Sequence, residues 1–259
     1  MRHRVLFVAS LAFALAVPAA FAGTPTRVTV RVLAKGAKFL GTSLAGAHVS
    51  LHDARTGRLL AEGVTRGSTG DTGRIMKTAH VRPAVLSTED AARFEATLDL
   101  DRPRLIEARA WGPLGQQAAT VRVTSQQWVV PGRDVTGGDG WVLELPGFAV
   151  DVLDPPHHVV LAGTPRPVTV RAHVTMMCGC PIEPGGLWDA DRIRVGALLY
   201  RAGEPAGEIA LEYAGRTSEF AGTFTPDVPG PWEVVVYAWD PRDGNTGVDR
   251  TTLVVGPGS

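Results

Sequence analysis

The segment from residue 173 to residue 181 contains the most unusual chemistry of the chain. It includes both cysteines, Cys178 and Cys180, and two of the four methionines, Met176 and Met177. Thiolate and thioether sulfurs are soft donors that favour Cu(I) over harder cations. The glycine between the cysteines allows the backbone to curl, so that both thiols can reach one ion. The spacing therefore indicates a soft-metal site, with copper as the expected ion.

Alternation along an extended strand sorts these donors into two groups. Met176 and Cys178 share one face, and with Cys180 they form the local ligand set. Met177 and His173 point the other way, and they would form a second set unless the strand ends early. The predicted metal site therefore depends on where this strand ends.

The two cysteines could instead form a disulfide, because thiols outside the cytoplasm tend to oxidise. A bridge between Cys178 and Cys180 spans one residue and departs from usual disulfide geometry. Strained bridges are the labile or catalytic ones, so the pair could exchange disulfides with a client protein. It could also be an inert bridge, or both cysteines could simply fill a core. The residue types alone leave these interpretations open.

The loop after the cysteines, residues 182–191, carries Trp188 and several carboxylates. An exposed tryptophan in a loop is a typical anchor for a protein partner, although a core role is equally compatible with the sequence. Asp189 and Asp191 could hold a cation or orient Arg192, and a solvated acidic loop is the favoured interpretation. Trp188 is therefore the predicted partner-binding residue.

Apolar and polar residues alternate along most of the chain, a period of two that indicates β-strands. We therefore expect strands to position these side chains. Hydrophobic residues make up 44% of the sequence, and its 30 glycines and 19 prolines fall mainly between the alternating runs. The pattern predicts strands over 27–32, 47–52, 58–61, 94–100, 105–110, 118–124, 141–145, 148–153, 167–177, 192–200, 207–213, 219–225, 232–239 and 248–255. This rhythm is typical of β-sandwiches.

Two interruptions of the rhythm carry predictions of their own. Residues 66–90 form a long glycine-containing stretch, and loops of this length are either functional or poorly ordered. Within it, residues 87–90 (STED) have the composition of a helix cap, which predicts a short helix through Phe94. Residues 240–245 only loosely resemble a calcium loop, so we interpret them as a hairpin turn.

A domain boundary is predicted near Phe148. Pro146-Gly147 and Asp154-Pro155-Pro156 flank this position, and proline prevents a strand from running through. The predicted organisation is a signal peptide over 1–22, a first β-sandwich domain over 23–147 and a second over 148–259. The fold class is therefore all-β, with two consecutive β-sandwiches.

The beginning of the first domain resembles the transthyretin-like or carboxypeptidase-regulatory-like β-sandwich. The resemblance rests on residues 46–53 (GAHVSLHD), which are followed by Thr56-Gly57 and residues 59–65 (LLAEGVT). In that group a GA-x-V-x-L strand precedes a hairpin. The match covers about 20 residues and implies a sandwich rather than an activity. The long stretch 66–90 departs from the compact form of that domain.

The end of the second domain resembles bacterial immunoglobulin-like domains. The resemblance rests on residues 224–238 (FTPDVPGPWEVVVYA), which are followed by Asp240 and Gly244-Asn245. In those domains such a stretch forms the final hairpin. The match covers about 30 residues and implies the fold without implying chemistry.

The N-terminus has the pattern of an export signal. The basic residues Arg2 and Arg4 precede an apolar run over 5–17, and Ala20 and Ala22 occupy the positions that a signal peptidase recognises. Thirteen helical residues cover only about 20 Å, less than a bilayer core. We therefore expect cleavage after Ala22 and a periplasmic or secreted protein without a membrane span. The arginine-rich, lysine-poor composition favours a bacterial periplasm.

Charge and motif content narrow the function further. Balanced totals of 26 basic and 26 acidic residues argue against nucleic-acid binding. The nucleophile elbow, zincin, P-loop and dinucleotide motifs do not occur in the sequence. We therefore predict a non-enzymatic binding or accessory protein whose partner is another periplasmic or membrane-associated protein. Its ligand would be a soft metal. A thiol–disulfide redox accessory protein and a scaffold without chemistry are the alternatives.

Overall fold

The computed structural model describes residues 23–81, 84–163 and 166–257. The predicted signal segment, residues 1–22, lies outside the described residues. Within these ranges strands make up most of the regular structure, together with four short helical turns: η1 Thr42–Leu44, η2 Gly73–Lys77, η3 Gln117–Ala119 and η4 Ala190–Arg192. None of the helices described is both long enough and apolar enough to cross a membrane.

Two sheets form the first sandwich. Its strands are β1 Thr24–Ala34, β2 His48–Asp53, β3 Leu59–Val64, β4 Phe94–Leu100, β5 Arg104–Gly112, β6 Val121–Val129 and β7 Trp141–Leu145. One sheet has the order β4-β1-β7 and the other β3-β2-β5-β6. Contacts of β3 with β4 and of β6 with β7 join the two layers.

Two further sheets form the second sandwich. Its strands are β8 Phe148–Asp154, β9 Val159–Leu161, β10 Val168–Met176, β11 Arg194–Arg201, β12 Glu204–Ala210, β13 Glu212–Tyr213, β14 Glu219–Phe224, β15 Gly230–Asp240 and β16 Asn245–Val255. The sheet orders are β13-β14-β10-β8 and β12-β11-β15-β16-β9. The contact of β8 with β16 joins these layers.

The period-two pattern of the sequence accounts for the core. In β1, Val28, Val30 and Val32 all point inward and are fully buried. β1 pairs antiparallel with β4 and parallel with β7, so that it lies in the middle of its sheet. The all-β class and the two consecutive sandwiches agree with the prediction and with the fold-level resemblances.

The helix predicted from residues 87–90 through Phe94 is wrong. The backbone N–H of Ser87 donates to the carboxylate of Asp139, and Arg93 forms a β-bridge with Arg66. A loop that binds residues so distant in sequence cannot also satisfy the local hydrogen bonds of a helix. Phe94 instead begins β4.

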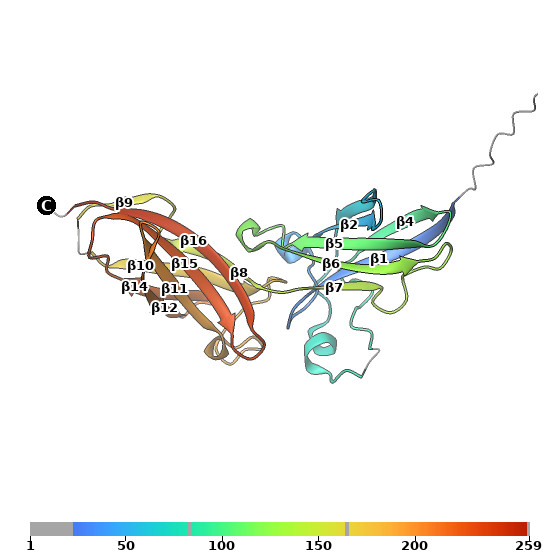
Figure 1. Cartoon of the computed structure of the whole chain (residues 1–259). Helices are drawn as coiled ribbons and strands as arrows, with labels where there is room; N and C mark the ends of the chain where they lie inside the picture. The colour runs from blue at the N-terminus through green and yellow to red at the C-terminus, as the bar shows by residue number, and fades with distance from the viewer. Residues whose placement is uncertain (1–22, 82–83, 164–165, 258–259) are drawn as a thin grey trace, which may run out of the picture.

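The long stretch 66–90 is held by a small core of its own. Phe39 and Ile75 pack with Ala91 and Ala92, separately from the main cluster. Figure 1 shows this segment in turquoise, with its single helical turn η2 projecting from the first sandwich. Four buried apolar side chains thus order the part of the loop that the sequence left undecided.

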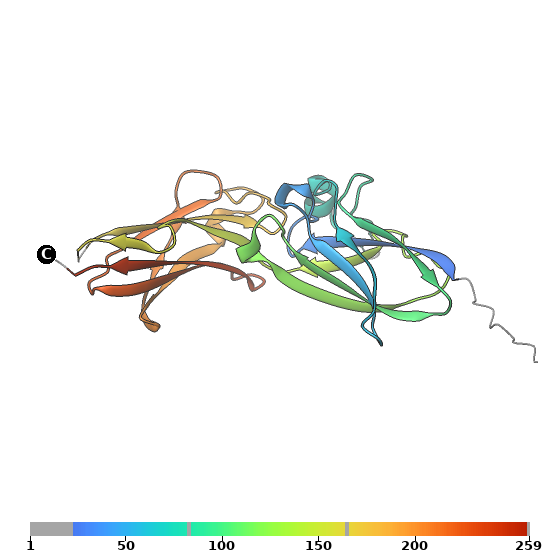
Figure 2. The same ribbon diagram turned by 90° about the horizontal axis from the view of Figure 1, so that it is seen from above.

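The sandwiches lie end to end, as Figures 1 and 2 show from two directions. The chain passes from β7 to β8 through Pro146 and Gly147 alone. Among the described residues, none of the four sheets combines strands from both sides of Gly147. The predicted boundary near Phe148 therefore falls at the change of sheets, and its role as a domain boundary stays a prediction.

Candidate functional site

Both cysteines lie in a tight turn that follows β10 and that we call the sulfur turn, residues 176–180. The N–H of Gly179 donates to the carbonyl of Met176 over 2.7 Å, and the N–H of Met176 donates to the carbonyl of Cys180 over 3.0 Å. Gly179 has a φ of +75°, a conformation that suits glycine. The turn places the Sγ atoms of Cys178 and Cys180 directly against each other.

The sulfur turn is buried almost completely. The exposed fractions are 4% for Met176, 0% for Met177, 1% for Cys178 and 5% for Cys180. All four side chains belong to the main hydrophobic cluster. Any chemistry at these sulfurs therefore requires the surrounding structure to open.

The five predicted metal donors do not form one set around the turn. β10 ends at Met176, so Met177 leaves the strand and packs against Gly147 instead of extending the face of His173. His173 pairs in register with Asp151 and Glu219, and it lies on the opposite face of β10 from Met176. Of the predicted donors, the structure brings together only the contiguous turn residues.

The sulfur turn contacts the first sandwich directly. The hydroxyl of Ser43, in η1, donates to the carbonyl of Cys178 over 2.7 Å. A Cβ built on Gly179 would lie 3.0 Å from Cγ of Leu44, so the turn and η1 are in close contact. The cysteines are thus part of the junction, by which we mean the contacts between the two sandwiches.

Two hydrogen bonds with Asn245, which we call the clamp, hold Gly147, the residue that links the two sandwiches. The side-chain carbonyl of Asn245, at the start of β16, accepts from the N–H of Gly147 over 2.7 Å. Its amide nitrogen donates to the carbonyl of Gly147 over 3.0 Å. Asn245 is buried, and the side chain of Met177 covers Gly147 from another direction. Gly147 is therefore fixed through both of its backbone polar groups.

Trp188 also belongs to the junction. Its indole N–H donates to the carbonyl of Gly36 over 3.0 Å, and its ring packs against the main cluster. Lys35 reaches across in the other direction and donates to the carbonyl of Asp243 over 2.9 Å. The predicted partner residue is thus engaged by its own chain, and its contact with an external partner stays a prediction.

A cavity of about 230 Å³ lies at the junction between these contacts. Met176 and Trp188 line it, together with Gly36 and the acidic hairpin that ends β15. Hydrogen bonds from the Arg242 side chain lower the pKa of Asp240 in that hairpin. The cavity leaves unfilled space beside Met176.

The loop after the cysteines is organised by Asp189. The backbone N–H groups of Gly185 and Asp191 donate to its carboxylate and lower its pKa, and Arg192 lies 3.2 Å from it. The predicted alternative that this carboxylate orients Arg192 agrees with that contact. Across the described ranges, His, Cys, Asp and Glu side chains do not gather in threes in any arrangement that could hold a metal ion.

Several junction residues had no signal in the sequence analysis. Ser43 and Gly36 lie more than a hundred residues from their partners Cys178 and Trp188. Asn245 lies in the stretch that resembles the final hairpin of immunoglobulin-like domains. That hairpin motif is the one sequence signal that could have identified it.

Comparisons with known proteins do not assign the chain to a family. No protein-family model matches the chain, and no curated protein matches it. Fibronectin(III)-like modules of CbhA from Clostridium thermocellum are 15% identical, with 93% of each chain covered and a TM-score of 0.31. Titin domains Z1Z2, in complex with telethonin, are 12% identical, with 92% of this chain and 98% of that chain covered and a TM-score of 0.25.

An engineered protein is 16% identical over 49% of this chain and 24% of its own length, with a TM-score of 0.32. TM-scores this far below 0.5 carry no argument about this chain. The assignment as a two-sandwich protein rests on the sheets themselves.

Proposed function

We propose that this protein is a non-enzymatic scaffold that works outside the cytoplasm, with the two sandwiches held in a fixed end-to-end arrangement. The observation that carries the proposal is the hydrogen bond from Ser43 to the carbonyl of Cys178. It ties the sulfur turn of one sandwich to η1 of the other. In this proposal the sulfur turn is a structural element of the junction.

A disulfide between Cys178 and Cys180 would hold the turn in its docking shape. The proposed export supports this bond, because thiols outside the cytoplasm tend to oxidise. Burial supports a structural bond over a catalytic one, because disulfide exchange needs a thiolate to approach a sulfur atom. The exposed fractions of Cys178 and Cys180 are only 1% and 5%.

The fixed linker supports the scaffold proposal independently. Asn245 binds both polar groups of Gly147, so rotation at the linker would break two buried hydrogen bonds. Breaking such bonds leaves unsatisfied groups, which cost about 1–3 kcal/mol each. A scaffold of this kind would present surfaces of both sandwiches at a set distance to a periplasmic or membrane-associated partner protein.

Cu(I) binding by Met176, Cys178 and Cys180 is the second proposed function. The observation that favours it is the cavity beside Met176, since a metal site needs room for an ion. In this proposal the cysteines are reduced, and the junction opens to admit the ion. Thiolates would then hold the metal, as expected for a soft cation.

The test combines the oxidation state with the shape of the molecule. We expect the mass of the purified exported protein to rise by ~2 Da on reduction, as one disulfide requires. We expect the Cys178→Ser/Cys180→Ser variant to lose about 1.5 kcal/mol of unfolding free energy, from the loop-closure entropy of so small a ring. Urea denaturation measures this loss.

Small-angle X-ray scattering then tests the fixed arrangement. We expect Ser43→Ala combined with Asn245→Ala to broaden the distribution of distances between the sandwiches. The matched control is Thr42→Ala, because the Thr42 hydroxyl bonds to Gly67 within the first sandwich. An unchanged distribution in the double variant would overturn the scaffold proposal. Uptake of one Cu(I) by the reduced protein, lost in Cys178→Ser, would favour the second proposal.

A further inference from the structure

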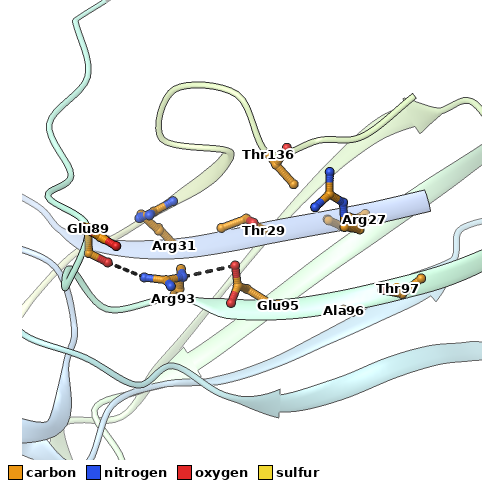
Figure 3. Close-up of a pocket in the computed structure, with 10 residues that line it drawn as sticks. Arg27, Thr29, Arg31, Glu89, Arg93, Glu95, Ala96, Thr97 and Thr136 are labelled. Atoms are coloured by element: carbon orange, nitrogen blue, oxygen red, sulfur yellow. Dashed lines mark hydrogen bonds and ion pairs between the residues drawn. The ribbon is translucent and has the colours of Figure 1, made fainter. Parts of the chain in front are cut away.

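A concave pocket of about 510 Å³ lies on the outer face of the β4-β1-β7 sheet. Alternate residues of β1 supply one wall, namely Arg27, Thr29 and Arg31, which point to the same side of the strand. Arg93 and Thr97 face them from the other side of the pocket. Figure 3 shows these side chains, with Thr136 above them on a neighbouring loop. We call this the arginine pocket.

Arg31 is the most unusual residue of the pocket. Its exposed fraction is only 7%, and its Nη1 donates to the backbone carbonyl of Asp139 over 3.0 Å. Its Nε is buried and has no hydrogen-bond partner among the described residues. Buried, unpartnered donors are costly and rare in native proteins. The pocket therefore contains a guanidinium whose hydrogen-bonding capacity the protein itself uses only in part.

The other two guanidiniums of the pocket also have partners at the rim. Arg27 pairs with Asp134 over 2.7 Å, and its side chain is otherwise exposed. Arg93 pairs with Glu95 over 3.1 Å and donates to the backbone carbonyl of Glu89. A guanidinium has five N–H donors, so both arginines keep donors for a ligand.

The charges around the pocket limit what it can hold. The acidic side chains Glu89 and Glu95 line the same space as the arginines, and the carboxylate of Asp139 is engaged by the N–H groups of Leu86 and Ser87. An extended polyanion would meet these carboxylates and be repelled. A compact group with a single anionic centre would present less negative charge to Glu89 and Glu95 than a polyanion does.

We propose that the arginine pocket binds a small ligand through one oxyanion group, a carboxylate or a phosphate. Planar guanidinium forks match the geometry of both groups. Arg31 and Arg93 donate to the oxyanion, and the hydroxyls of Thr29 and Thr97 complete its hydrogen bonds. The ligand would thereby take up guanidinium N–H groups of Arg31 other than the Nη1 group that bonds to Asp139.

The experiment titrates the complete mature protein with inorganic phosphate and, separately, with succinate. The readout is the melting temperature in differential scanning fluorimetry, with sodium chloride as the control at matched ionic strength. We expect one of the two probes to give a saturable rise that chloride does not reproduce. A response to phosphate alone identifies a phosphate group as the ligand chemistry, and a response to succinate alone identifies a carboxylate.

Variants then locate the site. We expect Arg31→Met and Arg93→Gln each to weaken binding at least about tenfold, as expected when a charge-assisted hydrogen bond is lost. Thr97→Glu places a carboxylate at the exposed mouth of the pocket, and it should weaken binding equally even if Arg31→Met does not fold. Arg122→Gln removes the same charge from β6, on the other sheet, and should leave binding unchanged.

Two results would overturn the proposal. One is a melting temperature that responds to phosphate and succinate no more than to chloride. The other is an affinity that is the same in the wild type and in both Arg93→Gln and Thr97→Glu. The junction does not enter this test, so its outcome is independent of the scaffold proposal.

Discussion

The sulfur turn and the arginine pocket are chemically the two most unusual regions of the molecule, and they differ in how well their polar groups are satisfied. The sulfur turn is contiguous in sequence, buried and held by its own backbone hydrogen bonds. The arginine pocket gathers residues from 27 to 136, opens to solvent and leaves Nε of Arg31 without a partner. A cluster of rare residues can therefore be structural, while an unsatisfied common residue indicates a site for a ligand.

The largest expected effect tests whether the sulfur turn is core. We expect Met177→Ala to lower the free energy of unfolding by about 2–5 kcal/mol, because it removes a fully buried side chain that packs on Gly147. Urea denaturation measures the change. Val160→Ala removes an exposed side chain and should stay within about 0.5 kcal/mol. A loss below about 1 kcal/mol in Met177→Ala would show that the sulfur turn is not an important part of the core.

A smaller effect isolates the contact between the turn and η1. Gly179→Ala places a Cβ 3.0 Å from Cγ of Leu44, while Gly215→Ala has nothing within 4 Å. The two glycines have φ values of +75° and +77°, so both variants carry the same backbone strain. We expect Gly179→Ala to be the more destabilising by about 1 kcal/mol, the cost of modest overpacking. Equal melting temperatures would show that the turn does not press on η1.

We expect the opposite behaviour from the arginine pocket. Arg31→Met should change the free energy of unfolding by less than about 1 kcal/mol, because a neutral side chain avoids the burial of an incompletely paired charge. Burial lowers the pKa of Arg31, because a buried charge is unfavourable, although the carboxylate of Asp139 raises it. Urea denaturation of the ligand-free protein measures the change. A loss above about 2 kcal/mol would mean that Arg31 is there for stability.

The smallest expected difference between the two regions is their response to acid pH. Burial raises the pKa of Asp139, but hydrogen bonds from Leu86 and Ser87 and the charge of Arg31 outweigh it, so the pKa lies below its ordinary value of 3.8. The stabilising contribution of the Asp139 carboxylate is therefore complete above pH 3.8 and is lost as the pH falls through the lowered pKa.

Amide NMR can follow this titration. The amide signals of Leu86 and Ser87 should shift as Asp139 gains its proton, and Asp139→Asn should abolish the shift. The amide of Gly179 bonds to a backbone carbonyl and should not move over the same range. A Gly179 amide that titrates together with Ser87 would contradict the expected independence of the two regions.

Alternating apolar residues predicted most of the strands, because a sheet with one buried face imposes period two directly on the sequence. β9, with three residues, was missed, since its pairing with β16 depends on a partner about ninety residues away. The helix at residues 87–94 was wrong for the same reason: Asp139 and Arg66 override the local preference.

The candidate site shows the same limit of sequence information. The sequence correctly placed both cysteines in one short segment after a strand, and it identified Trp188 as notable. It did not indicate that Ser43 would bond to Cys178 or that Gly36 would bond to Trp188. Contacts between the ends of two sandwiches depend on how loops meet in space, and a loop–loop contact leaves no periodic pattern in either segment.

The clamp on Gly147 also has a consequence for timing. Asn245 follows Gly147 by 98 residues, so the linker leaves the ribosome well before its partner exists. At about 5–20 residues per second, synthesis of that stretch takes about 5–20 s. Until Asn245 is available, the first sandwich can fold while the peptide groups of Gly147 still bond to water. The order of synthesis thus makes the junction one of the last parts of the protein to assemble.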